Sequence, residues 1–351
     1  MVMKKVLGLV AVLCLFTAPA VRAQTVDQVF GAGGLPTRGV IESVSSTEVV
    51  IKSNNVARKF PVNEILKITF ADDPTDLRTA RDRIRGGQIE DAARLLAQID
   101  VTKVGRNVVK QDVVYYLAFC QGKAALNSAK DSDKLDAEKK MREFYTVHAG
   151  TKSYHYFEGM KLLGDLAASM GNFDDAANYY KKFGEAPWAK SEGDLLVAGS
   201  MLKAAQYTDA LDKFKEVLAD ADGSPASEGR RLESLVGIAF CNAMSGKHTQ
   251  AIEELQDIIK KNDPTNTILF ARAYNALGAA HTAGNAPKDA VIAYLFTDLL
   301  FYGDSDAHAE ALYHLTSLWA KVNKPTRARE AREKLLGRYG GSPWAAKLRE
   351  S

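Results

Sequence analysis

The sequence predicts a mainly helical protein, built of stacked helical hairpins and preceded by a small β unit. An alanine recurs at intervals of 45, 39, 34, 41, 39 and 38 residues, and most of these alanines lie five residues after a glycine or asparagine. β-branched runs are confined to residues 37–70. A period of about 34–45 residues is typical of helical repeats that pack only on their neighbours. The repeating alanines are Ala92, Ala137, Ala176, Ala210, Ala251, Ala290 and Ala328.

Residues 1–23 have the pattern of a secretory signal peptide. Two lysines precede the apolar run Val6–Phe16, and small residues follow at cleavage spacing, so we expect cleavage after Ala23. The run is shorter than the ~20 residues that span a bilayer, which disfavours an uncleaved anchor. A lipid anchor at Cys14 is a further alternative. We therefore expect an exported protein of the periplasm or cell envelope, or a secreted one, with no transmembrane segment after cleavage.

The charge balance argues against nucleic acid as a partner. The chain has 46 basic and 43 acidic residues, and three of the basic residues lie in the signal peptide, which has no acid. The mature chain therefore carries 43 of each. A balanced protein has no net field that attracts phosphate backbones.

The β unit is predicted from residues that follow a linker. Residues 24–36 contain three glycines and a proline, which predicts a flexible linker. Residues 37–70 hold four short β-branched runs separated by serine and asparagine, so we expect a small sheet or partial barrel. A unit this small buries little surface, and we expect it to pack on the first helices.

Residues 75–351 have helical periodicity throughout. A helix begins after Pro74, and no later segment has a convincing strand pattern. About seven hairpins are expected, over residues 75–99, 111–149, 154–183, 191–219, 230–261, 271–301 and 309–339. A short closing segment follows.

Two of these hairpins carry the motif of a known family. The third contains Leu163, Gly164, Gly171, Phe173, Ala176 and Tyr180, and the sixth contains Leu277, Gly278, Asn285, Ala290 and Tyr294. At these spacings, residues 75–351 resemble the tetratricopeptide repeat (TPR) family. The resemblance implies a right-handed superhelix whose inner surface is lined by the first helix of each hairpin. The β unit is similar to SH3-like or Sm-like modules, and the C-terminal segment to exported bacterial repeat proteins of the cell envelope.

The same residues predict how the hairpins pack. Glycine would let the two helix backbones approach, alanine would leave room for the next hairpin, and the aromatic residue would fill the hole between units. A bulky residue at an alanine would cost about 1–3 kcal/mol. The predicted packing residues are Gly164, Ala176, Tyr180, Ala210, Phe214, Ala251, Gly278, Ala290, Tyr294 and Ala328.

Sequence patterns of catalytic and metal sites are missing. The chain has no P-loop, no zinc-binding pattern and no nucleophile elbow. Asp304, Asp306, His308 and Glu310 alternate in a way that suggests a divalent metal, but a capped helix start is the better interpretation. Cys120 and Cys241 lie about three repeats apart and are interpreted as buried thiols rather than a disulfide. We expect no enzymatic activity, cofactor or metal.

The first helices of the hairpins offer a candidate partner-binding groove. Its mixed polar surface suits an extended peptide or a partner helix, with Tyr313 as an anchor, although a solvated face without a ligand is the alternative. The family's carboxylate clamp is not reproduced, because the relevant positions hold Leu162, Leu196, Gly237 and Ala276. The predicted groove residues are Lys161, Asp165, Lys203, Arg272, Asn275, Tyr313, Ser317 and Lys321.

These observations predict an exported, non-enzymatic scaffold that binds protein or peptide partners. One alternative is a subunit of a cell-envelope assembly or export complex. A less favoured alternative is a ligand-binding or enzymatic role in the β unit, which has few polar side chains suited to catalysis.

Overall fold

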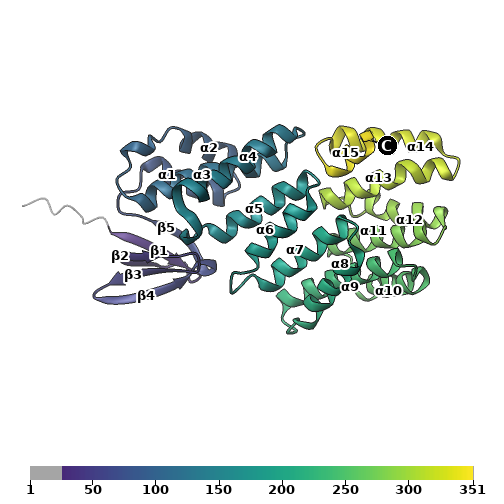
Figure 1. Ribbon diagram of the computed structural model, residues 1–351, viewed down its shortest axis with the longest axis horizontal. Helices are drawn as coiled ribbons and strands as arrows, with labels where there is room; N and C mark the ends of the chain where they lie inside the picture. The colour runs from purple at the N-terminus through teal and green to yellow at the C-terminus, as the bar shows by residue number, and fades with distance from the viewer. Residues whose placement is uncertain (1–25, 351) are drawn as a thin grey trace, which may run out of the picture.

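A computed structural model describes residues 26–350. A small antiparallel sheet lies at one end, and a curved stack of helical hairpins continues from it to the C-terminus (Figure 1). The predicted signal peptide lies outside the described residues. The mainly helical, TPR-like architecture with a preceding β unit is therefore as the sequence predicts.

The sheet has five strands in the order β4-β3-β2-β1-β5. Four of them match the four predicted runs. The predicted linker is wrong in part, because residues 27–31 form β1, which pairs with both β2 and β5. The strands are β1 (Asp27–Gly31), β2 (Pro36–Val44), β3 (Glu48–Ser53), β4 (Val56–Pro61) and β5 (Ile65–Thr69).

Strand β1 is held by one buried carboxylate and one buried apolar side chain. Asp27 accepts hydrogen bonds from the backbone N–H groups of Ile41 and Ala71 and from Arg106 Nη1, at 2.9, 2.9 and 2.7 Å. Val29 is fully buried. These partners lie far along the chain, and they order a glycine-containing segment that has little strand signal of its own.

The helices form seven consecutive hairpins and a closing helix. Each predicted hairpin is present, and a π-helical turn, Phe144–Ala149, follows α4. The helices are α1 (Thr75–Arg85), α2 (Ile89–Ala97), α3 (Asn107–Leu126), α4 (Asp131–Glu143), α5 (Tyr156–Ser169), α6 (Phe173–Phe183), α7 (Lys190–Lys203), α8 (Tyr207–Ala219), α9 (Pro225–Met244), α10 (His248–Lys261), α11 (Thr267–Ala283), α12 (Pro287–Leu299), α13 (Ser305–Lys321), α14 (Pro325–Arg338) and α15 (Pro343–Glu350).

The sheet and the first hairpin share one hydrophobic core. Val49 and Ile51 of β3 pack in the same cluster as Leu77 of α1, Leu96 of α2 and Val113 of α3, and all five are buried. The sheet therefore covers the N-terminal end of the helical stack. This agrees with the expectation that so small a unit packs on the first helices.

A buried ionic cluster fixes the first hairpins to one another. Arg81 of α1 donates to Asp73 Oδ2 and to Asp112 Oδ2 of α3, both at 2.5 Å. Asp112 also accepts from the Tyr154 hydroxyl at 2.6 Å and contacts His155 Nε2 at 3.1 Å. Arg81, Asp73 and Asp112 are all nearly inaccessible to solvent, so each charge depends on the others for compensation.

Six hairpins turn between their helices through the same backbone motif. In the turn that follows the first helix, a single residue adopts a positive φ, between 59° and 90°. The N–H of the residue after it donates to a carbonyl near the end of that helix, as from Asn172 to Ala167 at 3.0 Å. This is the Schellman motif, which favours glycine or asparagine at the left-handed position. The left-handed residues are Gly87, Gly171, Ala205, Gly246, Asn285 and Asn323. Each lies five residues before a repeating alanine.

The repeating alanines are buried in all but the last hairpin. Ala176, Ala210, Ala251 and Ala290 are fully buried. Ala328 is only half-buried, because no further hairpin stacks on α14 within the described chain, where only the short α15 follows.

The recurring spacing of glycine and aromatic residue, at Gly164 and Tyr180 and at Gly278 and Tyr294, places the glycine against the aromatic ring. A Cβ atom at Gly164 would lie 2.4 Å from the Tyr180 ring, and one at Gly278 would lie 2.6 Å from the Tyr294 ring. The glycine therefore seats the ring of the second helix rather than a helix backbone. Phe214 makes the equivalent contact with Gly237 of the next hairpin, where a Cβ would lie 2.5 Å from the ring.

The stack curves enough to bring its C-terminal loop onto the second hairpin. Lys134 of α4 is buried and donates to the carbonyl oxygens of Gly341 and Ser169, at 2.6 and 3.0 Å. A Cβ atom at Gly341 would lie 2.4 Å from the Ser128 carbonyl oxygen. Lys134 and Gly341, which form this hydrogen bond, are 207 positions apart in the sequence.

Candidate functional site

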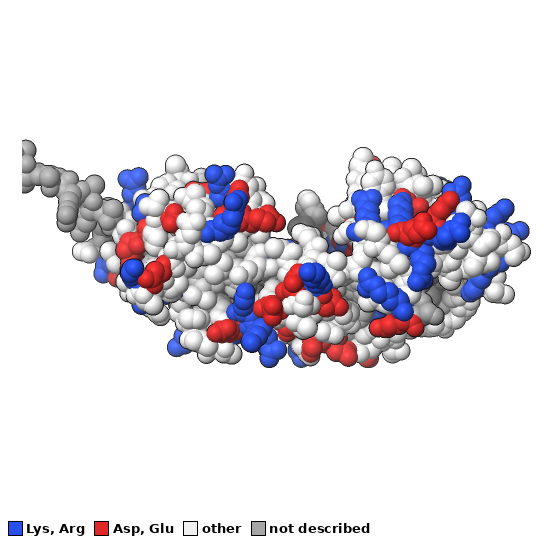
Figure 2. All heavy atoms as spheres, turned by 90° about the horizontal axis from the view of Figure 1, so that it is seen from above, with Lys and Arg blue, Asp and Glu red and all other residues white. Residues whose placement is uncertain are grey.

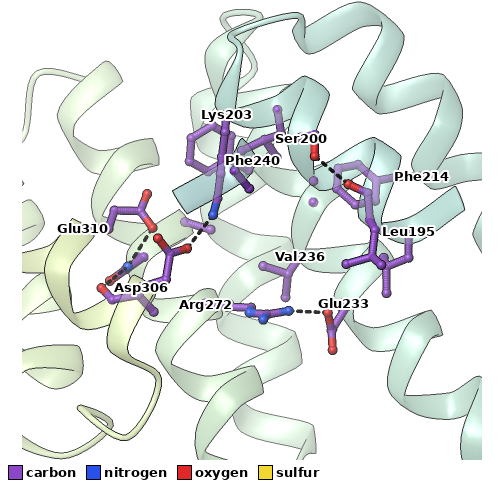
Figure 3. Close-up of a pocket in the computed structure, with 18 of the residues that line it drawn as sticks. Leu195, Ser200, Lys203, Phe214, Glu233, Val236, Phe240, Arg272, Asp306 and Glu310 are labelled. Carbon is purple, nitrogen blue, oxygen red and sulfur yellow. Dashed lines mark hydrogen bonds and ion pairs between the residues drawn. The ribbon is translucent and has the colours of Figure 1, made fainter. Parts of the chain in front are cut away.

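The first helices of four hairpins enclose a cavity on the inner side of the stack (Figure 3). Its volume is about 240 Å³. Helices α7, α9, α11 and α13 supply most of its lining, which agrees with the expectation that the first helices line the inner surface. The principal lining residues are Leu195, Leu196, Gly199, Lys203, Phe214, Glu233, Val236, Gly237, Phe240, Arg272, Asn275, Ala276, Asp306 and Glu310.

One wall of the cavity is apolar. This wall is formed by Leu195 and Leu196 of α7 and by Val236 and Phe240 of α9. Gly237 and Ala276 also line the cavity, and the Phe214 ring of α8 packs against Gly237. This wall offers an apolar side chain a place to pack.

The opposite wall comes from the start of α13, and its acids follow from the local fold. Asp304 caps the helix, since its Oδ1 accepts from the N–H groups of Asp306 and Ala307 at 3.0 and 3.1 Å. Asp306 and Glu310 lie one turn apart on the same face, as the helical period requires. His308 is buried instead against Asp298 and Tyr339. Among residues 26–350, no group of side chains suited to holding a metal is found here or elsewhere.

Both basic residues of the cavity are engaged in ion pairs. Lys203 Nζ lies 2.5 Å from Asp306 Oδ2, which links the fourth and seventh hairpins. Arg272 pairs with Glu233, and its Nη2 lies 3.4 Å from Asp304 Oδ2. Although burial opposes it, Lys203 holds the pKa of Asp306 below its usual value.

Glu310 differs from Asp306, because its hydrogen-bond partner is a neutral amide and Lys203 acts on it only through its longer-range charge. Its Oε2 accepts from Asn275 Nδ2 at 3.0 Å, and no ion pair to Glu310 is found among the described residues. Burial, together with the neighbouring charge of Asp306, raises the pKa of Glu310 to about 7.

Asn275 has an unused acceptor in the same cavity. Its amide nitrogen donates to the Ala307 carbonyl at 2.8 Å as well as to Glu310, whereas its Oδ1 has no donor. The side chain is 3% exposed. Rotating the amide by 180° would place its oxygen against the Ala307 carbonyl, so the two contacts fix the orientation.

The predicted groove residues separate into two groups. Lys203, Arg272 and Asn275 line the cavity. Asp165 accepts from the Tyr180 hydroxyl at 2.8 Å in an adjoining hollow that Lys203 also reaches, and Lys161 pairs with Glu192 beside a second hollow near the sheet.

Tyr313, Ser317 and Lys321 lie outside the cavity. The Tyr313 ring packs on Trp344, with ring centroids 5.4 Å apart, and Lys347 lies over it at 5.3 Å. Helix α15 folds back over α13 and occupies the face that the sequence suggested as an anchor. Ser317 and Lys321 are exposed beyond this contact.

The acids and the apolar wall of the cavity are not among the predicted groove residues. Glu233, Phe240, Asp306 and Glu310 all line the cavity. A signal for the last two was present, since their spacing of four residues from a capped helix start places them on one face.

Comparisons with known proteins identify the fold through structure alone. No protein-family model matches the chain, and no curated protein matches it. A solved tetratricopeptide repeat protein from Parabacteroides merdae is similar, with a TM-score of 0.56 and 14% identity over 75% of this chain and 91% of that one.

Two further solved structures share the fold. A Rap protein complexed with Competence and Sporulation Factor has a TM-score of 0.52 and 17% identity, and covers 78% of this chain and 77% of its own. NprR in complex with its cognate peptide NprX has a TM-score of 0.53 and 14% identity, over 78% and 80%. At such identities these similarities establish the TPR-like fold.

The face of the described chain that Figure 2 shows carries charges of both signs. Basic and acidic side chains are interspersed over the face in Figure 2, without a large area of one sign. No helix within residues 26–350 has the length and hydropathy of a membrane span.

Proposed function

We propose that the protein is an exported, non-enzymatic scaffold that binds an extended peptide or protein segment in the cavity between α7, α9, α11 and α13. The cavity itself carries the proposal. It combines an apolar wall with charged and hydrogen-bonding groups on rigid helices, as peptide-binding sites do.

Two structural neighbours support this choice of ligand. The Rap protein was solved in complex with Competence and Sporulation Factor and NprR in complex with its cognate peptide NprX, and both share the TPR-like fold. The likeness extends to the fold. Peptide binding by the present chain is our inference from its own cavity.

A matched pair of glycine substitutions tests the site. Gly199 lines the cavity, and a Cβ there meets no atom within 4 Å, so Gly199→Phe would place a ring in the open space. Gly229 of α9 also has an open Cβ position but does not line the cavity, and Gly229→Phe is its control. The assay is capture of peptides from a random decapeptide library by the purified protein.

Gly199→Phe should reduce capture strongly, and Gly229→Phe should leave it unchanged. If the unmodified protein captures no peptide, or if both variants capture peptides equally well, the proposed site is wrong. Circular dichroism confirms that both variants fold.

Export is the second part of the proposal. It is supported by the charged, apolar and small-residue pattern of residues 1–23. N-terminal sequencing of the protein recovered from its native cell should begin at Gln24. A chain that retains its first 23 residues and remains in the cytoplasm would contradict it.

A further inference from the structure

The lining of the cavity contains one buried acceptor without a donor and one carboxylate with a single neutral donor. The Asn275 Oδ1 is buried and has no partner, and the Glu310 carboxylate has a single neutral donor, Asn275 Nδ2. Both side chains line the cavity. A buried acceptor without a donor costs about 1–3 kcal/mol, so such a pair is a place where a donor-rich ligand gains affinity.

The charges around this pair favour a cationic ligand. Lys203 is committed to Asp306, and Arg272 to Glu233 and Asp304. Lys203 and Arg272 therefore share the cavity with three acidic side chains, Glu233, Asp306 and Glu310, and among the described residues Glu310 is the one of the three for which no ion pair is found. The remaining charge of the cavity is negative.

The apolar wall lies beside these acceptors. Val236 and Phe240 line the same cavity. A ligand that combines a cationic group with an adjacent apolar group would meet both surfaces. In a peptide this is a basic residue next to a large apolar residue.

We propose that the cavity recognises a basic side chain, arginine or lysine, whose donors pair with the Glu310 carboxylate and Asn275 Oδ1 while the neighbouring apolar residue of the peptide packs on Val236 and Phe240. This inference rests on the proposed function and specifies its ligand. It also predicts discrimination against acidic peptides, which Asp306 and Glu310 would repel.

The ionisation of Glu310 predicts that the binding of basic peptides depends on pH. Its pKa of about 7 means that Glu310 must lose a proton before it pairs with a cation, so basic peptides should bind more tightly at pH 8 than at pH 6. The other groups that face it are Lys203 of α7, Glu233 of α9, Arg272 of α11, Tyr294 of α12, and Asp304 and Asp306 of α13. Lys203 holds the pKa of Asp306 below its usual value, and the pKa values of Lys203, Arg272 and Tyr294 are raised, so these four groups keep their charge state between pH 6 and pH 8.

The experiment uses acetylated, amidated decapeptide libraries with a fixed central residue, which removes the terminal charges. The fixed residue is arginine, lysine, citrulline or glutamate, and binding of the whole protein is followed by fluorescence polarisation. Citrulline has nearly the shape of arginine without its charge. The variants are Glu310→Gln and, as a control, Glu333→Gln, an exposed carboxylate of α14 that does not line the cavity.

The arginine and lysine libraries should bind at least about tenfold more tightly than the citrulline library. Glu310→Gln should remove that preference without weakening the citrulline peptides, and Glu333→Gln should retain it. Peptide capture without a basic preference, or with a preference that survives in Glu310→Gln, would overturn this inference and leave the proposed function standing. Absence of any capture would remove both.

The pH profile of the unmodified protein gives an independent readout. The advantage of arginine over citrulline should grow between pH 6 and pH 8. If Glu310→Gln folds poorly, this profile still decides the matter, and an advantage that is the same at both values contradicts the role of Glu310.

Discussion

Ala205 occupies a backbone position that its counterparts in five other hairpins fill with glycine or asparagine. Its φ is 60°, it is exposed, and it belongs to the same turn motif as Gly171. The left-handed conformation costs an alanine about 1–2 kcal/mol, whereas glycine adopts it freely. Glycine also gains about 0.4–1 kcal/mol of conformational freedom in the unfolded chain, which offsets part of the benefit. Ala205→Gly should therefore raise the free energy of unfolding by about 0.5–1 kcal/mol.

Urea denaturation followed by circular dichroism measures this change. The neighbouring Ala204 has a φ of −76° at the end of α7, so Ala204→Gly should instead destabilise by about 0.5–1 kcal/mol. The reverse substitution, Gly171→Ala, should lower the stability by a similar amount because its φ is 79°. Equal effects of Ala204→Gly and Ala205→Gly would show that the left-handed turn carries no strain.

Two further predictions concern packing and buried charge. Gly278→Ala should destabilise by about 1–3 kcal/mol more than Gly229→Ala in the same denaturation assay, because the new Cβ would lie 2.6 Å from the Tyr294 ring while Gly229 has open space; a shared small stabilisation would mean that the ring moves freely aside. Asp112→Asn should cost about 3–5 kcal/mol at pH 7, since it leaves the buried Arg81 with one carboxylate. Burial opposes ionisation of Asp112, but Arg81, His155 and Tyr154 hold its pKa below the usual value, so its contribution is complete above about pH 4 and is lost as the pH falls through the lower folded value. The acid sensitivity of unfolding below pH 4 should thus be weaker in Asp112→Asn, and an unchanged profile would contradict the assignment.

Local chemistry made the hairpins readable from the sequence. A Schellman turn needs a residue in the left-handed conformation, and the tight contact between hairpins needs a small residue five positions later. The pair Gly171 and Ala176 therefore predicts both a turn and a packing surface. The second hairpin lacks this turn, and its signal was correspondingly weak. These requirements act within about ten residues, where the sequence order is also the spatial order.

Strand β1 and the site depend on contacts between residues that are far apart in the sequence. Asp27 acquires its partners from residues 41, 71 and 106, and no pattern within residues 24–36 reveals them. The helix face of Tyr313 suggested an anchor for a bound peptide, but Trp344 of α15 packs on its ring in the folded chain.

The sequence by itself determined the hairpin period, the turn residues and the helix faces, because short-range sterics and the helical repeat decide them. Only the tertiary structure decided that Lys203 meets Asp306, 103 residues away, and that Glu310 and Asn275 line the same cavity. Small rotations between neighbouring hairpins add up to the curvature that encloses the cavity. That sum depends on every interface in the stack, so no single repeat encodes it.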